Sequence, residues 1–172
     1  MKKIISIVAI LFFFATTYAQ EVKPTKQETM DWIGNKFTGC TGSLSTDKKF
    51  LHSFQNEYNN GAITINATSS DKLYDFVFYI DLTKLNKCEY VINDDGYEVK
   101  ISGISGFGYY KDAEKKISQN EITIFGIYKR TYGKVTGGFI NENCELDLKK
   151  RLITAFQTLA EYNNLEKPNE KF

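Results

Sequence analysis

The stretch Phe54-Gln-Asn-Glu-Tyr-Asn-Asn60-Gly61-Ala62-Ile-Thr-Ile-Asn-Ala-Thr68 decides the type of fold. After Gly61, apolar residues alternate with polar ones in single steps, which is the period of a strand with one buried face. Asn and Gly tolerate the positive φ angles of a type I′ turn, so Asn60-Gly61 between two such runs indicates a β-hairpin. The stretch therefore predicts two antiparallel strands, Phe50–Gln55 and Ala62–Thr68.

Runs of the same kind on the C-terminal side raise the expected number of antiparallel strands to six or seven. In the longest, Leu73–Leu82, the face that begins with Asp75 and ends with Asp81 is expected to look at solvent. The segment 104–120, which contains Gly106 and Gly108, is expected to be the longest loop. The other expected strands are Glu89–Asn93, Tyr97–Gly103, Glu121–Tyr128 and a short last strand within 131–140.

A helix is expected on each side of these strands. Thr25 and Glu28 have the spacing of a capping box, an apolar stripe follows them, and Gly39 ends the helix. From Cys144 to Asn163 the spacing of Leu148, Leu152, Ala155, Phe156 and Leu159 is typical of an amphipathic helix, with Leu146 widening its apolar face. The order helix, antiparallel strands, helix predicts one α+β domain over residues 20–165, followed by a flexible tail, 166–172.

The closing pattern Leu148-Lys-Lys-Arg151-Leu152-Ile-Thr-Ala155-Phe156-Gln-Thr-Leu159 resembles the last helix of small secreted bacterial proteins with a PH-like barrel. The resemblance implies a bent antiparallel sheet or PH-like barrel, capped at one end by this C-terminal helix. Phosphoinositide-binding PH domains carry basic residues across the first hairpin, whereas residues 54–64 here contain no Lys or Arg. Binding of a lipid headgroup is therefore not carried over.

The first nineteen residues predict a signal peptide. The basic start Met1-Lys2-Lys3 precedes the apolar run Ile4–Ala15, which is shorter than the about 20 residues that span a bilayer. Thr17-Tyr18-Ala19 then offers small residues for cleavage before Gln20. The expectation is an exported protein, periplasmic or extracellular, without stable membrane insertion.

Composition limits the classes of partner. Lys and Arg number 22 against 21 Asp and Glu, and this balance argues against a dedicated nucleic-acid binder. Aromatic residues make up 15% of the chain, which argues against disorder. The expected partner is a protein or a small polar ligand.

Cysteine and histidine offer little chemistry. Cys40, Cys88 and Cys144 form no C-x-x-C pair, and in an oxidising compartment they allow one disulfide drawn in three ways. Cys40–Cys144 is favoured because each residue lies at the end of a helix near the sheet. His52, the only histidine, lies in a strand in phase with Phe54 and is expected to be structural. No metal site and no cofactor are expected.

These patterns favour a non-enzymatic binding or interaction module of the bacterial envelope. The candidate binding residues are Tyr109, Tyr110 and Lys111, which fall in the expected loop with Asp112 and Glu114. Two alternatives remain open: an inhibitor or immunity-type protein that blocks one protein partner, and a small hydrolase that uses carboxylates.

Overall fold

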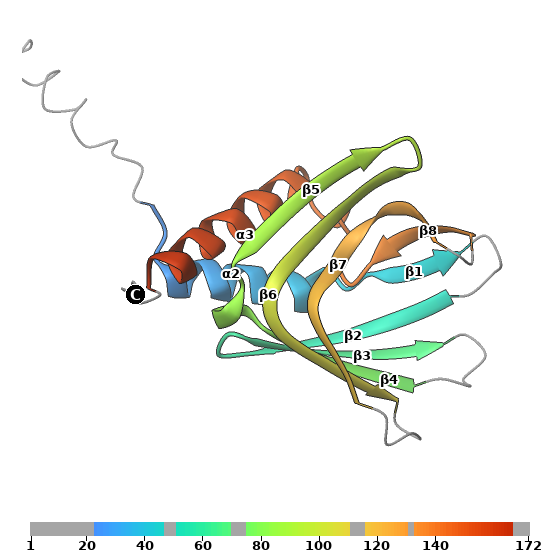
Figure 1. Cartoon of the computed structure of the whole chain (residues 1–172), viewed down its shortest axis with the longest axis horizontal. Coiled ribbons are helices and arrows are strands. Elements are labelled where there is room, and N and C mark those ends of the chain that lie inside the picture. The colour runs from blue at the N-terminus through green and yellow to red at the C-terminus, as the bar shows by residue number, and fades with distance from the viewer. Residues whose placement is uncertain (1–22, 47–50, 70–74, 111–115, 131–132, 167–172) are drawn as a thin grey trace, which may run out of the picture.

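The computed structural model describes residues 23–46, 51–69, 75–110, 116–130 and 133–166 (Figure 1). The expected signal peptide and most of the expected tail lie outside these ranges. The elements are α2 (Lys26–Gly39), β1 (Ser43–Thr46), β2 (Leu51–Asn59), β3 (Ala62–Ser69), β4 (Asp75–Asp81), the 3-10 turn η1 (Leu82–Lys84), β5 (Lys87–Asn93), β6 (Gly96–Tyr110), β7 (Lys116–Arg130), β8 (Gly133–Gly138) and α3 (Leu148–Leu165).

The strands form one antiparallel sheet in the order β4-β3-β2-β1-β8-β7-β6-β5. Because β4 also pairs with β6, seven strands close into a ring, and β5 continues the sheet beyond it. The α+β class is confirmed, but the sheet has eight strands rather than six or seven. The additional strand, β1, is only four residues long, and its sequence Ser-Leu-Ser-Thr has too little alternation of apolar residues to predict a strand.

The hairpin at Asn60-Gly61 is confirmed. Asn60 has φ 44° and Gly61 has φ 85°, the left-handed angles that this turn requires. The turn brings β2 and β3 into register from Asn59 and Ala62 to His52 and Ser69. The register places Phe54, Ile63 and Ile65 on the buried side of the sheet.

The prediction of a long loop over 104–120 was wrong. β6 continues to Tyr110 and β7 begins at Lys116, so most of the expected loop is paired backbone. A β-bulge between Ser102 and Gly106 interrupts the alternation of β6, so the sequence pattern does not indicate that the strand continues. Gly106 allows a close approach there, because a Cβ atom would lie 2.7 Å from the ring of Phe78.

The outer face of β4 is less exposed than expected. Val77 is 5% exposed, although it belongs to the face that was predicted to look at solvent. β4 has neighbours on both sides, because Val77 pairs with Asn66 of β3 and with Tyr109 of β6.

Both helices lie at one end of the closed sheet, at the left in Figure 1. The capping box of α2 is present, since the Thr25 side chain accepts from the Glu28 amide while Glu28 accepts from the Thr25 amide. The Glu28 carboxylate has a lowered pKa because of this backbone hydrogen bond. α2 packs against β2 and α3, and α3 packs against β5.

α3 begins later than expected. Residues 141–147 form turns, Asp147 has φ 55°, and the helix starts at Leu148. Glu145 and Asp147 therefore precede the first turn of the helix, and Leu146, expected on its apolar face, is 87% exposed. Cys144 joins Cys40 in the disulfide that the sequence analysis favoured, and this bond ties the turns to the end of α2.

Two buried asparagines attach the helices to the sheet. Asn163 of α3 donates to the carbonyl oxygens of Leu82 and Leu85, at 3.0 and 2.7 Å. Asn56 of β2 donates to the carbonyl oxygens of Phe37 and Phe139, at 2.9 and 2.7 Å. Each amide thus donates to two backbone carbonyl oxygens, of which those of Leu82 and Phe139 also accept from the backbone amides of Leu85 and Gly42.

Candidate functional site: an aromatic and charged cleft

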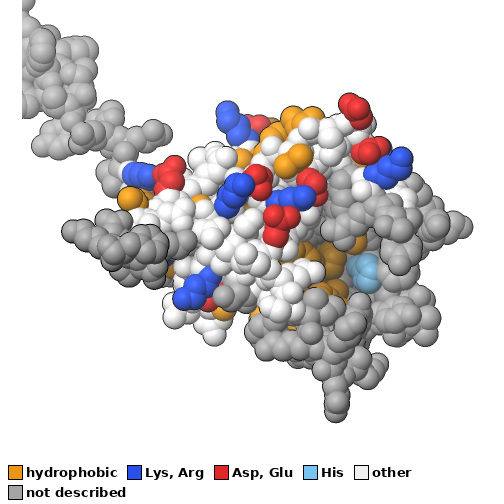
Figure 2. Space-filling model, viewed as in Figure 1, with side chains coloured by type: hydrophobic (Ala, Val, Ile, Leu, Met, Phe, Trp, Pro, Cys, Tyr) orange, Lys and Arg blue, Asp and Glu red, His pale blue; other side chains and the backbone are white. Residues whose placement is uncertain are grey.

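The described residues leave a cleft of about 490 Å³ inside the curved sheet, away from the helices. In Figure 2 hydrophobic side chains are visible beside the single histidine, His52, which stacks on the cleft residue Phe54. A volume of this size falls in the range of small-molecule sites, which also occur in the mouths of β-barrels. The cleft is lined by the apolar residues Leu44, Phe54, Phe76, Phe78, Ile122, Gly138 and Phe139 and by the polar residues Asn93, Asp95, Glu98, Lys100, Gln119, Glu121, Thr123 and Lys129.

Four phenylalanines form the apolar side of the cleft. Phe54 packs edge-on against Phe139 with ring centroids 4.9 Å apart, and Phe78 stacks with both Phe139 and Phe76, at 6.4 and 5.9 Å. Phe54 and Phe78 are buried, whereas Phe76 and Phe139 are partly exposed. The two partly exposed rings are therefore held in place by buried neighbours, and they offer a rigid surface to an apolar or aromatic group.

Charged side chains from β6 and β7 form another side. Lys100 lies 3.0 Å from a carboxylate oxygen of Glu98 and 3.7 Å from one of Glu121. The hydroxyl of Thr123 donates to Glu98 over 3.2 Å, and that of Ser102 donates to Glu121 over 3.4 Å. The alternation of β6 sets this side, because Val99 and Ile101, between these polar residues, are buried on the opposite face.

The three ionised groups differ in exposure. The side chain of Glu98 is 14% exposed, that of Lys100 28% and that of Glu121 52%. The hydrogen bond to Glu98 raises the pKa of Lys100, with further contributions from the charges of Glu98, Glu121 and Glu89, although partial burial opposes them. Lys100 is thus a permanent cation at neutral pH, suited to holding charges in place rather than to accepting a proton.

The binding residues predicted from the sequence do not line the cleft among the described residues. Tyr109 and Tyr110 belong to β6 and pair in register with Val77 and Phe76, so they are strand residues rather than loop residues. Lys111, together with Asp112 and Glu114, lies outside the described residues. The structure brings only Tyr110 into register beside a cleft residue, Phe76.

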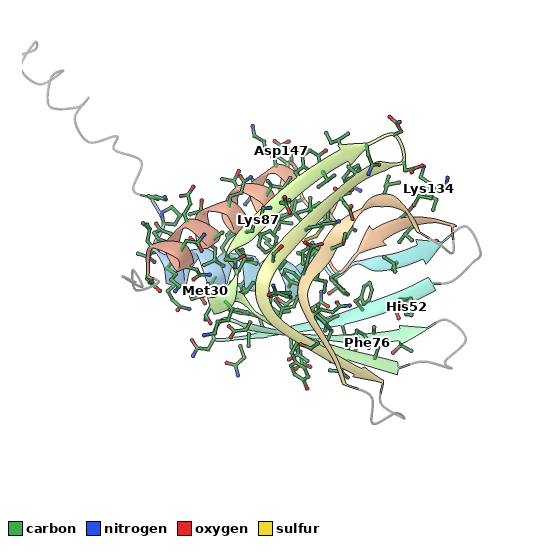
Figure 3. The ribbon with its side chains drawn as sticks, in the orientation of Figure 1. Met30, His52, Phe76, Lys87, Lys134 and Asp147 are labelled. Atoms are coloured by element: carbon green, nitrogen blue, oxygen red, sulfur yellow. A yellow bond between two sulfur atoms is a disulfide. The ribbon has the colours of Figure 1, made fainter. Side chains whose placement is uncertain are left out.

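His52 lies at the margin of the cleft. Its ring stacks over Phe54, with centroids 6.5 Å apart and planes 9° apart. Figure 3 labels His52 and Phe76 at this end of the sheet and Met30 among the helices at the other end. The packing of His52 on a core ring agrees with the structural role expected of it.

The remaining cysteine is poorly suited to nucleophilic chemistry. Burial, with a smaller contribution from the charge of Glu89, raises the pKa of the Cys88 thiol to about 12. A thiol with so high a pKa is hardly ionised at neutral pH and is a weak nucleophile. Among the described residues, no three His, Cys, Asp or Glu side chains are grouped so that they could hold a metal ion.

A second depression, of about 730 Å³, lies along α2 and α3 and contains Trp32. The Trp32 ring already has two cations over it, Lys36 at 5.5 Å and Arg151 at 5.1 Å. Lys36 and Arg151 both pair with Glu145, which lowers the pKa of that carboxylate. Because this aromatic surface is occupied by the protein's own side chains, we take the cleft as the candidate site.

No family model matches the chain, and neither a curated protein nor a solved structure matches it. In the part of the chain that the structure describes, no helix is long and apolar enough to cross a membrane. The resemblance to secreted proteins with a PH-like barrel stays a prediction. The functional argument therefore rests on the geometry of the cleft.

The sequence analysis missed the charged side of the cleft. A signal was present, since Glu98, Lys100 and Ser102 alternate with Val99 and Ile101. Alternation shows that the two faces of a strand differ, and a polar face is read as a solvent-exposed face by default. Only the curvature of the sheet turns this polar face toward the rings of β2 and β4.

Proposed function

We propose that this protein is an exported, non-enzymatic binding module that holds a small ligand in the cleft. The observation that carries the proposal is that one concave site combines a rigid aromatic surface with an ordered set of charges. Ligand sites typically join apolar walls to a few fixed polar groups that orient the ligand. Export is supported by the N-terminal pattern of the sequence and agrees with the Cys40–Cys144 disulfide.

The proposal includes the finer description of the fold. We assign the closed sheet with its C-terminal helix to the PH-like barrel architecture, on strand order and on the position of the helix at one end. In this description β5 is an extension of the barrel. The site proposed here is the inside of the sheet at the open end, which differs from the basic first hairpin that binds phosphoinositides in PH domains.

A carboxylate-dependent hydrolase is the second candidate, and one observation favours it. Glu98 and Glu121 both lie in the cleft, and glycoside hydrolysis uses two carboxylates on either side of the scissile bond. However, both carboxylates contact Lys100, so its ammonium group occupies the position between them that a substrate needs. Binding without turnover is the reading that this geometry supports better.

The binding proposal is tested by filling the cleft. Gln119 is exposed and lines the cleft, so Gln119→Trp should occupy its volume without entering the core. Thr154→Trp adds the same bulk to the groove along the helices and is the matched control. We expect a library of small molecules that join a ring to a charged group to perturb backbone NMR signals around Lys100 and Phe139.

These perturbations should persist in Thr154→Trp and disappear in Gln119→Trp. Perturbations that map to the groove along the helices, or that survive in Gln119→Trp, would place the site elsewhere. Export is tested separately by mass spectrometry of the N-terminus of protein from its own host, which should begin at Gln20.

A further inference from the structure

The charges of the cleft do not cancel. The described residues that line it include three carboxylates, Asp95, Glu98 and Glu121, and two ammonium groups, Lys100 and Lys129. Lys100 is shared by two of the carboxylates, at 3.0 and 3.7 Å. Lys129 lies 4.0 Å from Asp95 at the rim, where both side chains are more than half exposed and the interaction is weak. The described lining residues therefore carry a surplus of one negative charge, and Lys100 among them is already engaged by two carboxylates.

The surplus negative charge is accessible to a ligand at Glu121. Its side chain is 52% exposed, and its described partners are a hydroxyl at 3.4 Å and the shared Lys100 at 3.7 Å. Glu98, in contrast, is largely buried and holds Lys100 and the Thr123 hydroxyl. Lys100 lies closer to Glu98, at 3.0 Å, than to Glu121, at 3.7 Å. The Glu121 carboxylate can therefore still accept a hydrogen bond from a further donor.

The aromatic side of the cleft favours the same sign of charge. The faces of phenylalanine rings carry partial negative charge and attract ammonium and guanidinium groups within about 6 Å. Phe76 and Phe139 are the partly exposed rings, and they also supply apolar contact area. An anion in the same place would meet ring faces and carboxylates, and it would have to draw Lys100 away from Glu98.

We infer that the cleft is selective for small organic cations in which an ammonium or guanidinium group is joined to an aromatic or apolar body. The inference rests on the proposed function and names its ligand class. In this arrangement the apolar body lies against Phe76 and Phe139, and the cationic group donates to Glu121. The volume of about 490 Å³ accommodates a ligand of this size inside the cleft.

The inference is tested with three probes of matched size that differ in charge. These are 2-phenylethylamine as the cation, 2-phenylethanol as the neutral analogue and 3-phenylpropionate as the anion. Titration of the wild-type protein, followed by NMR, should give the highest affinity for the amine and the lowest for the carboxylate. An affinity for the carboxylate that equals or exceeds that for the amine would overturn the inference while leaving the binding proposal intact.

Two variants move the affinity in opposite directions. Glu121→Gln removes the surplus charge, so binding of the amine should weaken roughly two- to fivefold, while binding of the alcohol stays unchanged. Lys100→Met releases both carboxylates, so binding of the amine should tighten by a similar factor. Lys150→Ala, on an exposed position of α3, is the control and should change neither value.

The outcomes separate the two proposals. If none of the three probes binds in the cleft, the proposed function fails together with the ligand class. If the amine and the alcohol bind equally, and Glu121→Gln has no effect, the cleft binds rings without regard to charge and only the ligand class fails. Amine binding that weakens in Glu121→Gln and with added salt supports the inference.

Discussion

The two ends of the closed sheet have opposite chemistry. At the helical end, meaning α2, α3 and the strand residues they cover, Phe37 and Phe156 are fully buried and meet edge-on at 6.4 Å. At the open end, meaning the cleft, aromatic rings are partly exposed and three charged side chains share one network. The packing at the helical end therefore supplies the stability that allows the open end to keep apolar surface and charges facing a cavity.

The polar groups at the two ends also serve different purposes. Asn56 and Asn163 donate to backbone carbonyls and fasten one segment to another. Glu98, Lys100 and Glu121 bond mainly to each other, and they fasten no helix. Asn56 connects the ends, because its amide holds the carbonyl of Phe37 at the end of α2 and that of Phe139 beside the cleft.

The largest expected effect is the loss of an aromatic ring at the helical end. Phe156→Ala should lower the free energy of unfolding by about 3–5 kcal/mol, because the cavity removes contacts with Phe37 and the sheet. Lys150→Ala on the exposed side of the same helix should change it by less than about 0.5 kcal/mol. Equal, small effects in denaturant titrations would contradict the contrast between the two ends, since α3 would then not supply the stability.

Removing the disulfide should give the next largest loss of stability. Cys40 and Cys144 are 104 residues apart, so replacing both with Ala frees a long loop in the unfolded chain. The expected loss is about 2–5 kcal/mol. Chemical denaturation of the double variant measures it. A variant as stable as the wild type would show that packing alone holds the turns before α3 in place.

Removing a buried amide side chain should lower the free energy of unfolding less. Asn163→Ala removes the hydrogen bonds to the carbonyls of Leu82 and Leu85, and Leu82 keeps only the longer bond from the Leu85 amide, at 3.3 Å. The expected cost is about 2 kcal/mol. Asn164→Ala is the matched control, because Asn164 is exposed and donates to the Asn86 carbonyl from the surface. Thermal unfolding of the two variants should show a clear drop in midpoint for the first alone.

The smallest effect is expected at the open end. Lys100→Met should cost about 1 kcal/mol or less at pH 7, because the ion pairs of Lys100 are partly exposed to solvent. The hydrogen bond to Glu98 raises the pKa of Lys100, so the stabilisation is complete below the unfolded value of about 10.4. It is lost as the pH rises through the folded pKa, and the difference from the variant should therefore shrink above about pH 10.4. A cost like that of Phe156→Ala would contradict the contrast between the ends.

Several features follow from local sequence. The spacing of Thr25 and Glu28 predicted a capping box, and Asn60-Gly61 predicted the hairpin between β2 and β3. These features depend on backbone angles and on hydrogen bonds within a few residues, which the identities of the residues largely set. The amphipathic spacing of Leu152 and Phe156 predicted the buried face of α3 for the same reason.

Other features needed contacts between distant segments. A bulge between Ser102 and Gly106 concealed the length of β6, and Gly106 there lies close to Phe78 of β4, a residue distant in the sequence. The start of α3 at Leu148 accompanies the turns tied by Cys144, where local propensity had favoured an earlier start. Neither the spacing of residues along the chain nor the period of the apolar residues indicates the bulge in β6 or the start of α3.

Residue identities alone predict the α+β class, the two helices, the first hairpin and the alternation of Glu98 and Lys100 with apolar residues. Tertiary structure alone decided that β4 pairs with β6 and that the polar face of β6 turns inward. The physical reason is that alternation assigns residues to two faces of a strand, whereas curvature and closure of the whole sheet decide which face surrounds a cavity. The candidate site, built from β2, β4, β6 and β7, exists only after that closure.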